Sequence, residues 1–272
     1  MVNKCKESIV IPKIIHYCWF GKNPLPDEAR ECIASWKKNL PDYEIKEWNE
    51  SNFDLRSSIY AMKAYNNKNW AFVSDYVRLC VLVKYGGVYL DTDVEIVKNM
   101  DLLLKYKGFC CFETKKQLCT AVLACEPNFE LFRKWLHLYD TKVFNENYEE
   151  PNVILFTKIC QQYGLVLNNK SQSINGLQVF PSEYFSPKNY VTGNISLTNN
   201  TFAIHHFSES WHSDLEKEMH KREQKMIQQY GYKKGKRISK VANFPFKIYN
   251  ALRKRGVAGE FQYIVSKFTQ SR

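Results

Sequence analysis

The 272-residue sequence lacks any long apolar run. No stretch of about 18 apolar residues occurs, so we expect no transmembrane helix. The first residues, Met-Val-Asn-Lys-Cys-Lys-Glu, contain no apolar signal core, and we therefore expect a cytoplasmic protein. Internal repeats and low-complexity tracts are also missing, which excludes repeat architectures. With 44% apolar residues, the chain can still bury a sizeable core.

Paired cysteine motifs are missing as well. The nine cysteines are odd in number and contain no Cys-x-x-Cys. Several of them lie inside apolar runs, such as Cys80 and the neighbours Cys110 and Cys111. This pattern is typical of small buried hydrophobic residues in a reducing compartment. It argues against a disulfide framework or a structural zinc site.

Acidic residues are scarce only at the end of the chain. Residues 1–232 hold 28 Lys or Arg and 27 Asp or Glu, whereas residues 233–272 hold 11 and one. The net charge of +11 therefore comes almost entirely from the tail. We predict a main domain at residues 1–232 and a basic amphipathic segment at residues 233–272.

Apolar side chains are interleaved with the charges of this basic segment. Residues 233–255 contain nine basic residues and no acidic one. The interleaved side chains are Ile238, Val241, Phe244, Phe246, Ile248, Tyr249 and Leu252. A basic amphipathic stretch suits an anionic membrane surface, so we expect peripheral binding at the inner face of the cell membrane. A plain solvated tail is the alternative, and no signature of nucleic-acid binding accompanies the charge.

The first 90 residues alternate between strand and helix patterns. Residues 9–20 and 43–48 are rich in β-branched and aromatic residues, and a helix pattern over residues 27–39 lies between them, which predicts a βαβ unit. Residues 71–85 form a helix pattern that is apolar nearly all round and is therefore buried. Residues 88–90 predict a short buried strand. We expect an α/β fold.

Two aspartates follow this short strand. Asp91 and Asp93 flank Thr92, and residues two apart in a strand point the same way. Two converging carboxylates repel each other unless a cation lies between them or one takes up a proton. Mg²⁺ and Mn²⁺ prefer such oxygen ligands and keep open positions for phosphate oxygens. The alternative is an ordinary polar turn.

Three further residues stand out before the aspartates. Asp75 and Arg78 share one face of the buried helix, so their charges must be paired or used. They either form an internal ion pair or hold the hydroxyls of a polar ligand in the same cleft. Trp19, at the end of the first strand, either stacks on a nucleobase or is part of the core.

A polar cluster appears late in the chain, at His205, His206, Glu209 and Trp211. Histidine and glutamate bind metals or phosphates when they converge. Either histidine alone can equally be a structural residue at a strand end. As a group, these residues predict a loop that closes over the site.

These residues together resemble glycosyltransferase family 32, the sugar transferases with an Asp-x-Asp (DXD) motif. The resemblance rests on Ile11-Pro-Lys-Ile-Ile-His-Tyr-Cys-Trp-Phe-Gly21, Ser35-Trp36, Pro41-Asp42-Tyr43, Trp48-Asn49, Ala71-x-x-Ser74-Asp75-x-x-Arg78 and Gly86-Gly87-x-Tyr89-x-Asp91-x-Asp93. The family includes bacterial capsular polysaccharide enzymes, yeast Golgi mannosyltransferases and, more distantly, clostridial toxin domains. The resemblance covers residues 9–105, and residues 203–211 show a weaker similarity to the family. The middle differs from many bacterial members, which have Thr-Gly-Pro where this chain has Glu150-Pro151-Asn152.

The resemblance implies a GT-A type nucleotide-sugar-binding fold, with a mixed, mostly parallel sheet and flanking helices. It also implies a nucleotide-sugar donor, Mn²⁺ or Mg²⁺, and retention of anomeric configuration. Carried over by position, Asp75, Arg78, Asp91 and Asp93 are the expected catalytic residues, Trp19, Ser74, Tyr89 and Trp211 the donor-binding residues, and Asp91, Asp93, His206 and Glu209 the metal ligands.

The expected function is transfer of a sugar from a UDP- or GDP-sugar to a glycan or lipid-linked acceptor in surface polysaccharide synthesis. No carboxylate is marked as a glycosyl nucleophile, which favours a front-face displacement in which the leaving phosphate helps to deprotonate the acceptor. Two alternatives remain open. One is a nucleotide-sugar hydrolase on the same fold, and the other is a non-enzymatic basic module that binds membranes or nucleic acid.

Overall fold

The computed structural model describes residues 10–145, 149–208, 213–246, 248–249 and 252. The chain divides into two compact units. The first comprises residues 1–188 and 195–208, and the second comprises residues 189–194 and 209–272. The candidate site residues that the structure describes all belong to the first unit.

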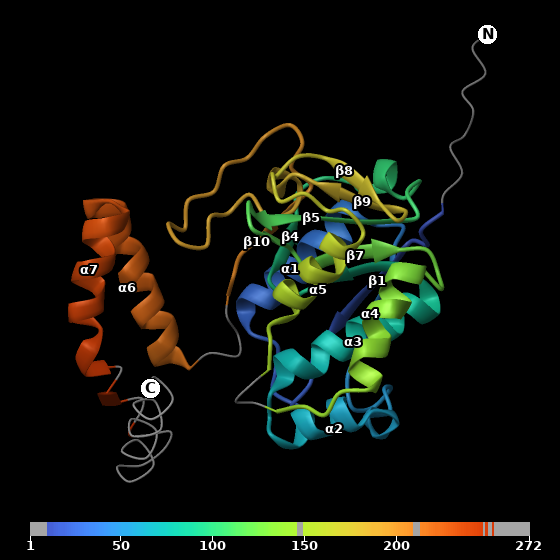
Figure 1. The fold of residues 1–272 in the computed structure, drawn as a ribbon, viewed down its shortest axis with the longest axis horizontal. Helices are drawn as coiled ribbons and strands as arrows, with labels where there is room; N and C mark the ends of the chain where they lie inside the picture. The colour runs from blue at the N-terminus through green and yellow to red at the C-terminus, as the bar shows by residue number, and fades with distance from the viewer. Residues whose placement is uncertain (1–9, 146–148, 209–212, 247, 250–251, 253–272) are drawn as a thin grey trace. The chain divides into compact units, whose positions relative to one another are not determined.

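A mixed sheet of eight strands forms the centre of the first unit (Figure 1). Its order is β2-β1-β3-β7-β5-β9-β8, and β6 pairs with β5. The strands are β1 (Ile14–Cys18), β2 (Glu44–Trp48), β3 (Gly87–Leu90), β5 (Gly108–Thr114), β6 (Gln117–Leu118), β7 (Val122–Cys125), β8 (Gln172–Ile174) and β9 (Leu177–Phe180). The pairs β1–β2, β1–β3 and β5–β9 are parallel and the others antiparallel. Strands β1, β2, β3, β5 and β9 therefore share one direction, and β6, β7 and β8 run against it.

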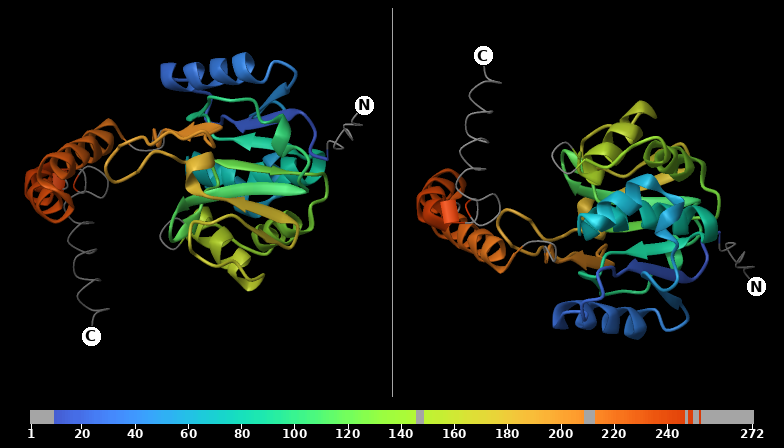
Figure 2. Two further views of the ribbon diagram at one scale, coloured as in Figure 1. Left: turned by 90° about the horizontal axis from the view of Figure 1, so that it is seen from above. Right: turned by 90° about the horizontal axis from the view of Figure 1, so that it is seen from below.

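Helices cover both faces of this sheet (Figure 2). The helix α1 (Asp27–Asn39) lies on one face, while α4 (Glu130–Asp140) and α5 (Asn152–Gln162) lie on the other together with α2 (Ile59–Asn66) and α3 (Trp70–Tyr85). A two-stranded sheet of β4 (Val94–Ile96) and β10 (Ala203–His205) and the short helices η1 (Leu55–Ser57), η2 (Asp101–Leu103) and η3 (Ser182–Tyr184) complete the unit. This arrangement confirms the expected α/β fold with a mixed sheet and flanking helices. The prediction that the sheet is mostly parallel is wrong, because four of its seven strand pairs are antiparallel.

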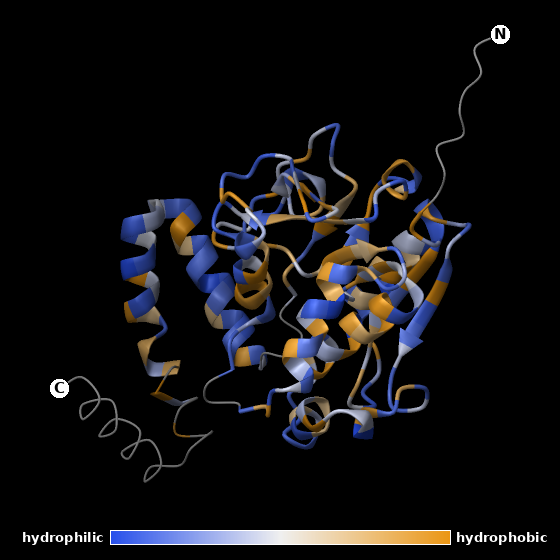
Figure 3. Cartoon of the chain, turned by 45° about the vertical axis from the view of Figure 1, so that its right-hand side comes forward, coloured by the Kyte–Doolittle hydropathy of each residue, from blue (hydrophilic) through white to orange (hydrophobic). Residues whose placement is uncertain are grey.

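Two hydrophobic cores fill the space between the sheet and its helices. The larger contains the apolar side chains of α2 to α5, including Trp135 and Phe156, whose rings stack with centroids 4.3 Å apart. The other surrounds Trp36 of α1. Figure 3 shows hydrophobic residues concentrated on the strands and on the helices packed against them. The eight cysteines that the structure describes are all free, and seven of them are buried.

The predicted elements of the first 90 residues are confirmed, with one strand shorter than expected. β1 begins at Ile14 and ends at Cys18, although the sequence pattern extends over residues 9–20. Pro12 has no backbone N–H, and the Ile14 N–H bonds back to the Pro12 carbonyl in a turn, so pairing with β2 and β3 starts only at Ile14 and Ile15. Residue 9 lies outside the described part of the chain.

The second unit is built around α6 (Asp214–Tyr230) and α7 (Tyr232–Ala242). A Cβ atom on Gly235 of α7 would lie 2.3 Å from the Met226 carbonyl oxygen of α6, so only glycine fits this approach. The domain boundary predicted at residues 232/233 falls at the start of α7, inside this unit. The prediction followed the change in charge, whereas the compact unit follows packing, which joins α7 to the charge-balanced α6. Among the described residues, no helix is both long and apolar enough to span a bilayer.

Candidate functional site

A glycine turn places β3 and the aspartates that follow it. Gly86 ends α3 at φ 64°, and Gly87 follows at φ 98°, a conformation that disfavours other residues. A Cβ on Gly87 would lie 2.6 Å from the Ile14 carbonyl oxygen of β1. His16 of β1 supports the turn, since its Nε2 lies 2.8 Å from the Gly86 carbonyl oxygen and its Nδ1 accepts from Trp48 Nε1 at 3.1 Å. Burial lowers the pKa of His16 to about 4, so the ring is neutral.

The segment between β3 and β4 is fixed at both ends. Asp91 N donates to the Ala121 carbonyl oxygen at 2.9 Å, which extends the pairing of β3 with β7 by one residue. At the other end of the segment, two side chains of α1 hold β4. Trp36 Nε1 donates to the Val94 carbonyl oxygen and Asn39 Nδ2 donates to the Ile96 carbonyl oxygen, both at 2.6 Å. The two carboxylates are thus held by backbone contacts of the scaffold.

Asp91 is bound by the side chains of α3 and β3. Arg78 Nη2 lies 3.3 Å from Asp91 Oδ1, and the Tyr89 hydroxyl donates to the same oxygen at 3.1 Å. The Arg78 guanidinium also stacks over the Tyr89 ring, 4.5 Å from its centroid. Burial raises the pKa of Asp91, Arg78 works against this, and Asp93 adds to it. The Asp91 side chain is 28% exposed, whereas that of Arg78 is 4% exposed.

Asp75 lies deeper, behind Arg78. Its Oδ1 lies 2.9 Å from Arg78 Nη2 and also accepts from Asn152 Nδ2 of α5. Asn152 is itself held by the Thr120 hydroxyl at 3.0 Å, and Arg78 Nη1 donates to the Thr120 carbonyl oxygen at 2.7 Å. Burial raises the pKa of Asp75 to about 7, with Arg78 opposing the rise. The predicted ion pair is therefore present, and it supports Asp91 from behind.

Asp93 faces the late segment of the chain. Its Oδ1 lies 3.5 Å from His205 Nε2 of β10, and its Oδ2 accepts from the Ser208 N–H at 2.8 Å. The Asp93 carbonyl oxygen accepts from the His206 N–H at 2.9 Å. Burial works to raise the pKa of Asp93, but His205 and Ser208 outweigh it, so the pKa lies below its usual value. Ligand atoms of Asp91, Asp93 and His205 lie within 4.8 Å of one another.

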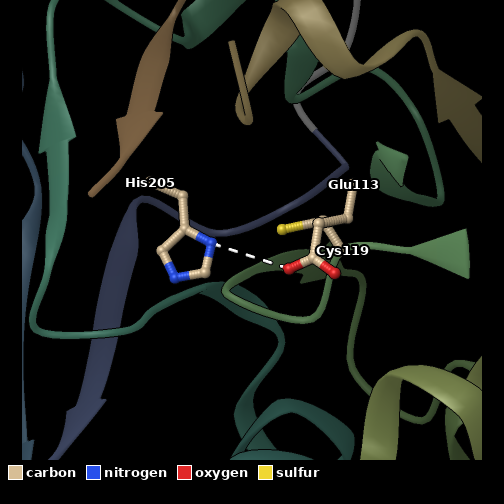
Figure 4. A group of neighbouring side chains, drawn as sticks. All are labelled: Glu113, Cys119 and His205. Carbon is tan, nitrogen blue, oxygen red and sulfur yellow. Dashed lines mark ion pairs between the residues drawn. The ribbon is translucent and has the colours of Figure 1, made fainter. Parts of the chain in front are cut away.

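The other nitrogen of His205 points toward Glu113 and Cys119 (Figure 4). Nδ1 lies 3.9 Å from Glu113 Oε1. Burial lowers the pKa of His205, yet the Asp93 carboxylate raises it further, so the net pKa lies well above the usual value. Burial also raises the pKa of Glu113 to about 7.

The late cluster is arranged differently from the prediction. His205, not His206, lies beside the aspartates. The ring of His206 faces the opposite way, and its Nε2 lies 2.9 Å from Glu95 Oε2 of β4. Side chains of adjacent extended residues point to opposite faces, so only one of the two histidines can face Asp93. Glu209 and Trp211 lie outside the described residues.

The predicted donor-binding residues occupy different places. Trp19 follows β1, is half-buried and donates from Nε1 to the Asn23 carbonyl oxygen at 2.6 Å. It borders a surface hollow together with Lys22, Asn23, Glu47, Asn49, Glu50 and Ser51. The Ser74 hydroxyl donates to the Ala71 carbonyl oxygen at 2.7 Å and receives Arg78 Nη2 at 3.4 Å. Ser74 and Tyr89 are thus tied to the Arg78 network, and Trp19 borders this surface hollow.

Three contacting residues were missed from the sequence. Asn152 lies in the segment that departs from the family, and its contact with Asp75 depends on how α5 packs. Glu113 and Cys119 belong to the β5–β6 hairpin, which carries no motif. For His205, the alternation of side chains along a strand that starts at Ala203 was an available signal, because it separates the two histidines.

Comparison with known proteins places the aspartates in a recognised region. Residues 26–109 match the model of the family "Glycosyltransferase sugar-binding region containing DXD motif". The inositol phosphoceramide mannosyltransferase 3 of Schizosaccharomyces pombe is 34% identical over 107 residues, which are 38% of this chain and 30% of that protein. The lactosylceramide 4-alpha-galactosyltransferase of Mus musculus is 32% identical over 152 residues, covering 49% of this chain and 40% of that protein.

The chain thus spans less than half the length of these curated relatives. Among solved structures, the PaToxG glycosyltransferase resembles it with 21% identity and a TM-score of 0.45, over 56% of this chain and 69% of that chain. The family match includes α3, β3 and both aspartates. The resemblance predicted from the sequence is confirmed for this segment: residues 26–109 are similar to the DXD-containing sugar-binding region of glycosyltransferases.

Proposed function

We propose that the protein is a metal-dependent, retaining glycosyltransferase that moves a hexose from a UDP- or GDP-sugar to a glycan or lipid-linked acceptor. The observation that carries this proposal is the convergence of His205 of β10 with Asp91 and Asp93, which follow β3 and lie in the family-matched region. Two carboxylates and an imidazole at one point, with an arginine behind them, are suited to a cation and an anionic leaving group.

The donor set fits a divalent ion. Asp91 offers Oδ2, because its Oδ1 is engaged by Arg78 and Tyr89, and Asp93 lies with Oδ1 toward His205. Carboxylate oxygens suit Mg²⁺ and Mn²⁺, and the imidazole nitrogen favours the transition ion, so we propose Mn²⁺ over Mg²⁺. When bound, such an ion stabilises the negative charge that develops on a departing diphosphate.

The residues of the chain hold this site in place. Arg78 holds Asp91 in place and opposes the rise in the pKa of Asp91 that burial causes. The N–H groups of Ser208 and His206 orient Asp93 through its side chain and its carbonyl oxygen. Because these contacts exist before any ligand arrives, little reorganisation is needed when a donor binds. Trp19, at the end of β1, is proposed to stack on the base of the donor.

A lipid-linked acceptor is supported by the relatives. The names of both curated relatives, an inositol phosphoceramide mannosyltransferase and a lactosylceramide galactosyltransferase, specify ceramide-containing compounds. A role in surface polysaccharide synthesis by a bacterial enzyme is part of the same proposal, since the sequence resembles capsular enzymes of the family.

The basic segment would bring the enzyme to such acceptors. On α7, Gly235 and Ser239 are buried, while Lys236, Arg237 and Lys240 are exposed. Apolar side chains accompany them, since Val241 is 76% exposed and Phe244 is 61% exposed. We propose that residues 233–255 bind an anionic membrane surface from the cytoplasmic side. Of these, residues 247, 250–251 and 253–255 lie outside the described residues.

The catalytic proposal is tested by analysing products with candidate UDP- and GDP-sugars, with and without glycan or lipid acceptors. Sugar transferred to an acceptor in the presence of Mn²⁺ supports it. Free sugar alone, at the same rate with and without acceptor, would show the nucleotide-sugar hydrolase instead. A covalent sugar trapped on a carboxylate side chain would refute the front-face displacement.

The membrane proposal is tested by co-sedimentation with vesicles. Phosphatidylglycerol vesicles are expected to carry the protein down at low salt, and phosphatidylcholine vesicles are not. The double variant Val241→Asp, Phe244→Asp is expected to lose this binding while keeping transfer to a soluble acceptor. Equal binding to both kinds of vesicle, or no loss in the variant, would contradict it.

A further inference from the structure

A second group of potential metal ligands shares His205 with the aspartates. It consists of Glu113 at the end of β5, Cys119 just after β6, and His205 of β10 (Figure 4). A carboxylate oxygen, the thiol sulfur and a ring nitrogen of the three lie within 4.8 Å of one another. Because 85 residues lie between Cys119 and His205, the fold and not the local sequence creates this group.

His205 Nδ1 supplies an independent sign of a missing ligand. It is buried and has no hydrogen-bond partner among the described residues. The His205 side chain is 10% exposed, and the nearest carboxylate oxygen, Glu113 Oε1, lies 3.9 Å away, beyond hydrogen-bond distance. A buried polar atom without a partner costs free energy, so such atoms usually mark an ion, a water molecule or a strained contact.

The remaining ligands are held in place by the hairpin. Cys119 N donates to the Cys111 carbonyl oxygen at 2.9 Å, and Glu113 Oε2 accepts from the Gln117 side chain. The Glu113 side chain is 11% exposed, about as little as that of His205.

The chemistry of this group differs from that of the DXD site. Thiolate, imidazole and carboxylate are the ligands that Zn²⁺ takes in proteins, whereas Mg²⁺ and Mn²⁺ rarely take sulfur. His205 offers one nitrogen to each group, since Nε2 faces Asp93 and Nδ1 faces Glu113. We propose that Glu113, Cys119 and His205 form a second cation site, for a thiophilic divalent ion such as Zn²⁺, which shares His205 with the Asp91–Asp93 site.

On binding, the Cys119 thiol and His205 Nδ1 release their protons to solvent, and the sulfur and the ring nitrogen each donate an electron pair to the ion. The shared histidine couples the two sites, because a neutral ring donates one nitrogen at a time, so an ion on Nδ1 leaves the Nε2–H facing Asp93. The proposal does not depend on sugar transfer, because it concerns metal binding alone.

The test uses Co²⁺ as a spectroscopic probe of the full-length protein, kept reduced and first freed of metal with a chelator. A cobalt ion bound by Cys119 is expected to give a thiolate-to-cobalt charge-transfer band in the near ultraviolet. Added Zn²⁺ should remove the band by displacement. Cobalt at the Asp91–Asp93 site has only oxygen and nitrogen ligands and gives no such band.

Cys119→Ala is expected to abolish the band, and Cys160→Ala, which removes a buried free cysteine of α5, is expected to keep it. Glu113→Gln should weaken cobalt binding about tenfold or more and serves as the second variant if Cys119→Ala does not fold. A wild-type protein without the band, a band that survives Cys119→Ala, or unchanged affinity in Glu113→Gln would overturn the proposal.

Discussion

Asp91 and Asp93 are separated by one residue, yet they have opposite surroundings. Asp91 is tied to Arg78 and Tyr89, is the more exposed of the two, and has a pKa raised by burial. Asp93 is tied to His205 and Ser208, and its pKa is lowered despite burial. The motif is therefore a pair of unlike carboxylates.

The origin of the partners explains this difference. The partners of Asp91 come from α3 and β3, within 13 residues of it in the sequence, while His205 and Ser208 come from more than 100 residues away. Asp91 belongs to a network that one short segment can build alone. Asp93 acquires its low pKa only when β10 pairs with β4. The pKa of Asp93 is therefore lowered by distant partners, while burial leaves that of Asp91 raised.

The largest expected effect is on the rate of sugar transfer, and it differs between the two aspartates. Asp93→Asn should lower the rate of sugar transfer by about 10²–10³-fold or more with the fold intact, because it removes the charged ligand. Asp91→Asn should cost less, since Arg78 still occupies that side. Steady-state transfer assays and circular dichroism measure both variants. Normal turnover in Asp93→Asn, or a larger loss in Asp91→Asn, would refute the distinction.

Removing Arg78 tests the local network. Arg78→Met leaves Asp75 and Asp91 without their buried partner, so the free energy of unfolding should fall by about 3–5 kcal/mol. Urea unfolding measures this, with Arg133→Met on the exposed surface of α4 as the control. A loss equal to that of the control would show that the ion pair does not hold Asp91.

The stability of the fold is expected to depend on pH through His16, which supports the glycine turn before the two aspartates. The unfolded chain protonates this ring near pH 6.5, whereas burial lowers its folded pKa to about 4. Stability is therefore present above pH 6.5 and is lost as the pH falls toward 4. The shift corresponds to about 3 kcal/mol.

The stability advantage of the wild type over His16→Gln should shrink by about this amount between pH 7 and pH 4. Urea unfolding at both pH values measures it, with His137→Gln on exposed α4 as a control for general pH effects. A difference that does not change with pH would contradict a neutral buried His16.

The smallest expected effect is a change in Mn²⁺ affinity, which distinguishes the two histidines. His205→Ala should weaken Mn²⁺ binding by about 10–100-fold, because Asp93 loses its neighbour in the donor set. His206→Ala should change Mn²⁺ binding little, since its ring contacts Glu95. Isothermal titration of both variants with Mn²⁺ decides between them. Equal losses, or a larger loss in His206→Ala, would restore the assignment made from the sequence.

The part of the site formed by α3, the glycine turn and β3 could be predicted from the sequence. The helix that carries Asp75 and Arg78, the glycine turn and the strand before Asp91 are contiguous, and their spacing alone fixes their faces. The family resemblance was visible in the same segment. Local patterns of this kind survive in the sequence because the contacts are local.

The contacts that α5, β5 and β10 make in the site could not be predicted in the same way. The contact of Asn152 with Asp75 and the approach of Glu113 to His205 depend on packing between elements distant in the chain. The sequence prediction chose His206, whereas the structure has His205 beside Asp93, because the strand register decides which side chain faces the aspartates. The boundary predicted from charge differs from that of the compact units, because charge does not report how α6 and α7 pack.

One measurement tests the central claim that these unlike aspartates hold a cation for a nucleotide-sugar donor. The melting temperature of the full-length protein is followed with a panel of UDP- and GDP-sugars, each with Mn²⁺ and with chelator. We predict that at least one donor raises the melting temperature with Mn²⁺ and not with chelator, and that Asp93→Asn abolishes the shift. No shift with any donor, or the same shift in chelator and in Asp93→Asn, would contradict the account.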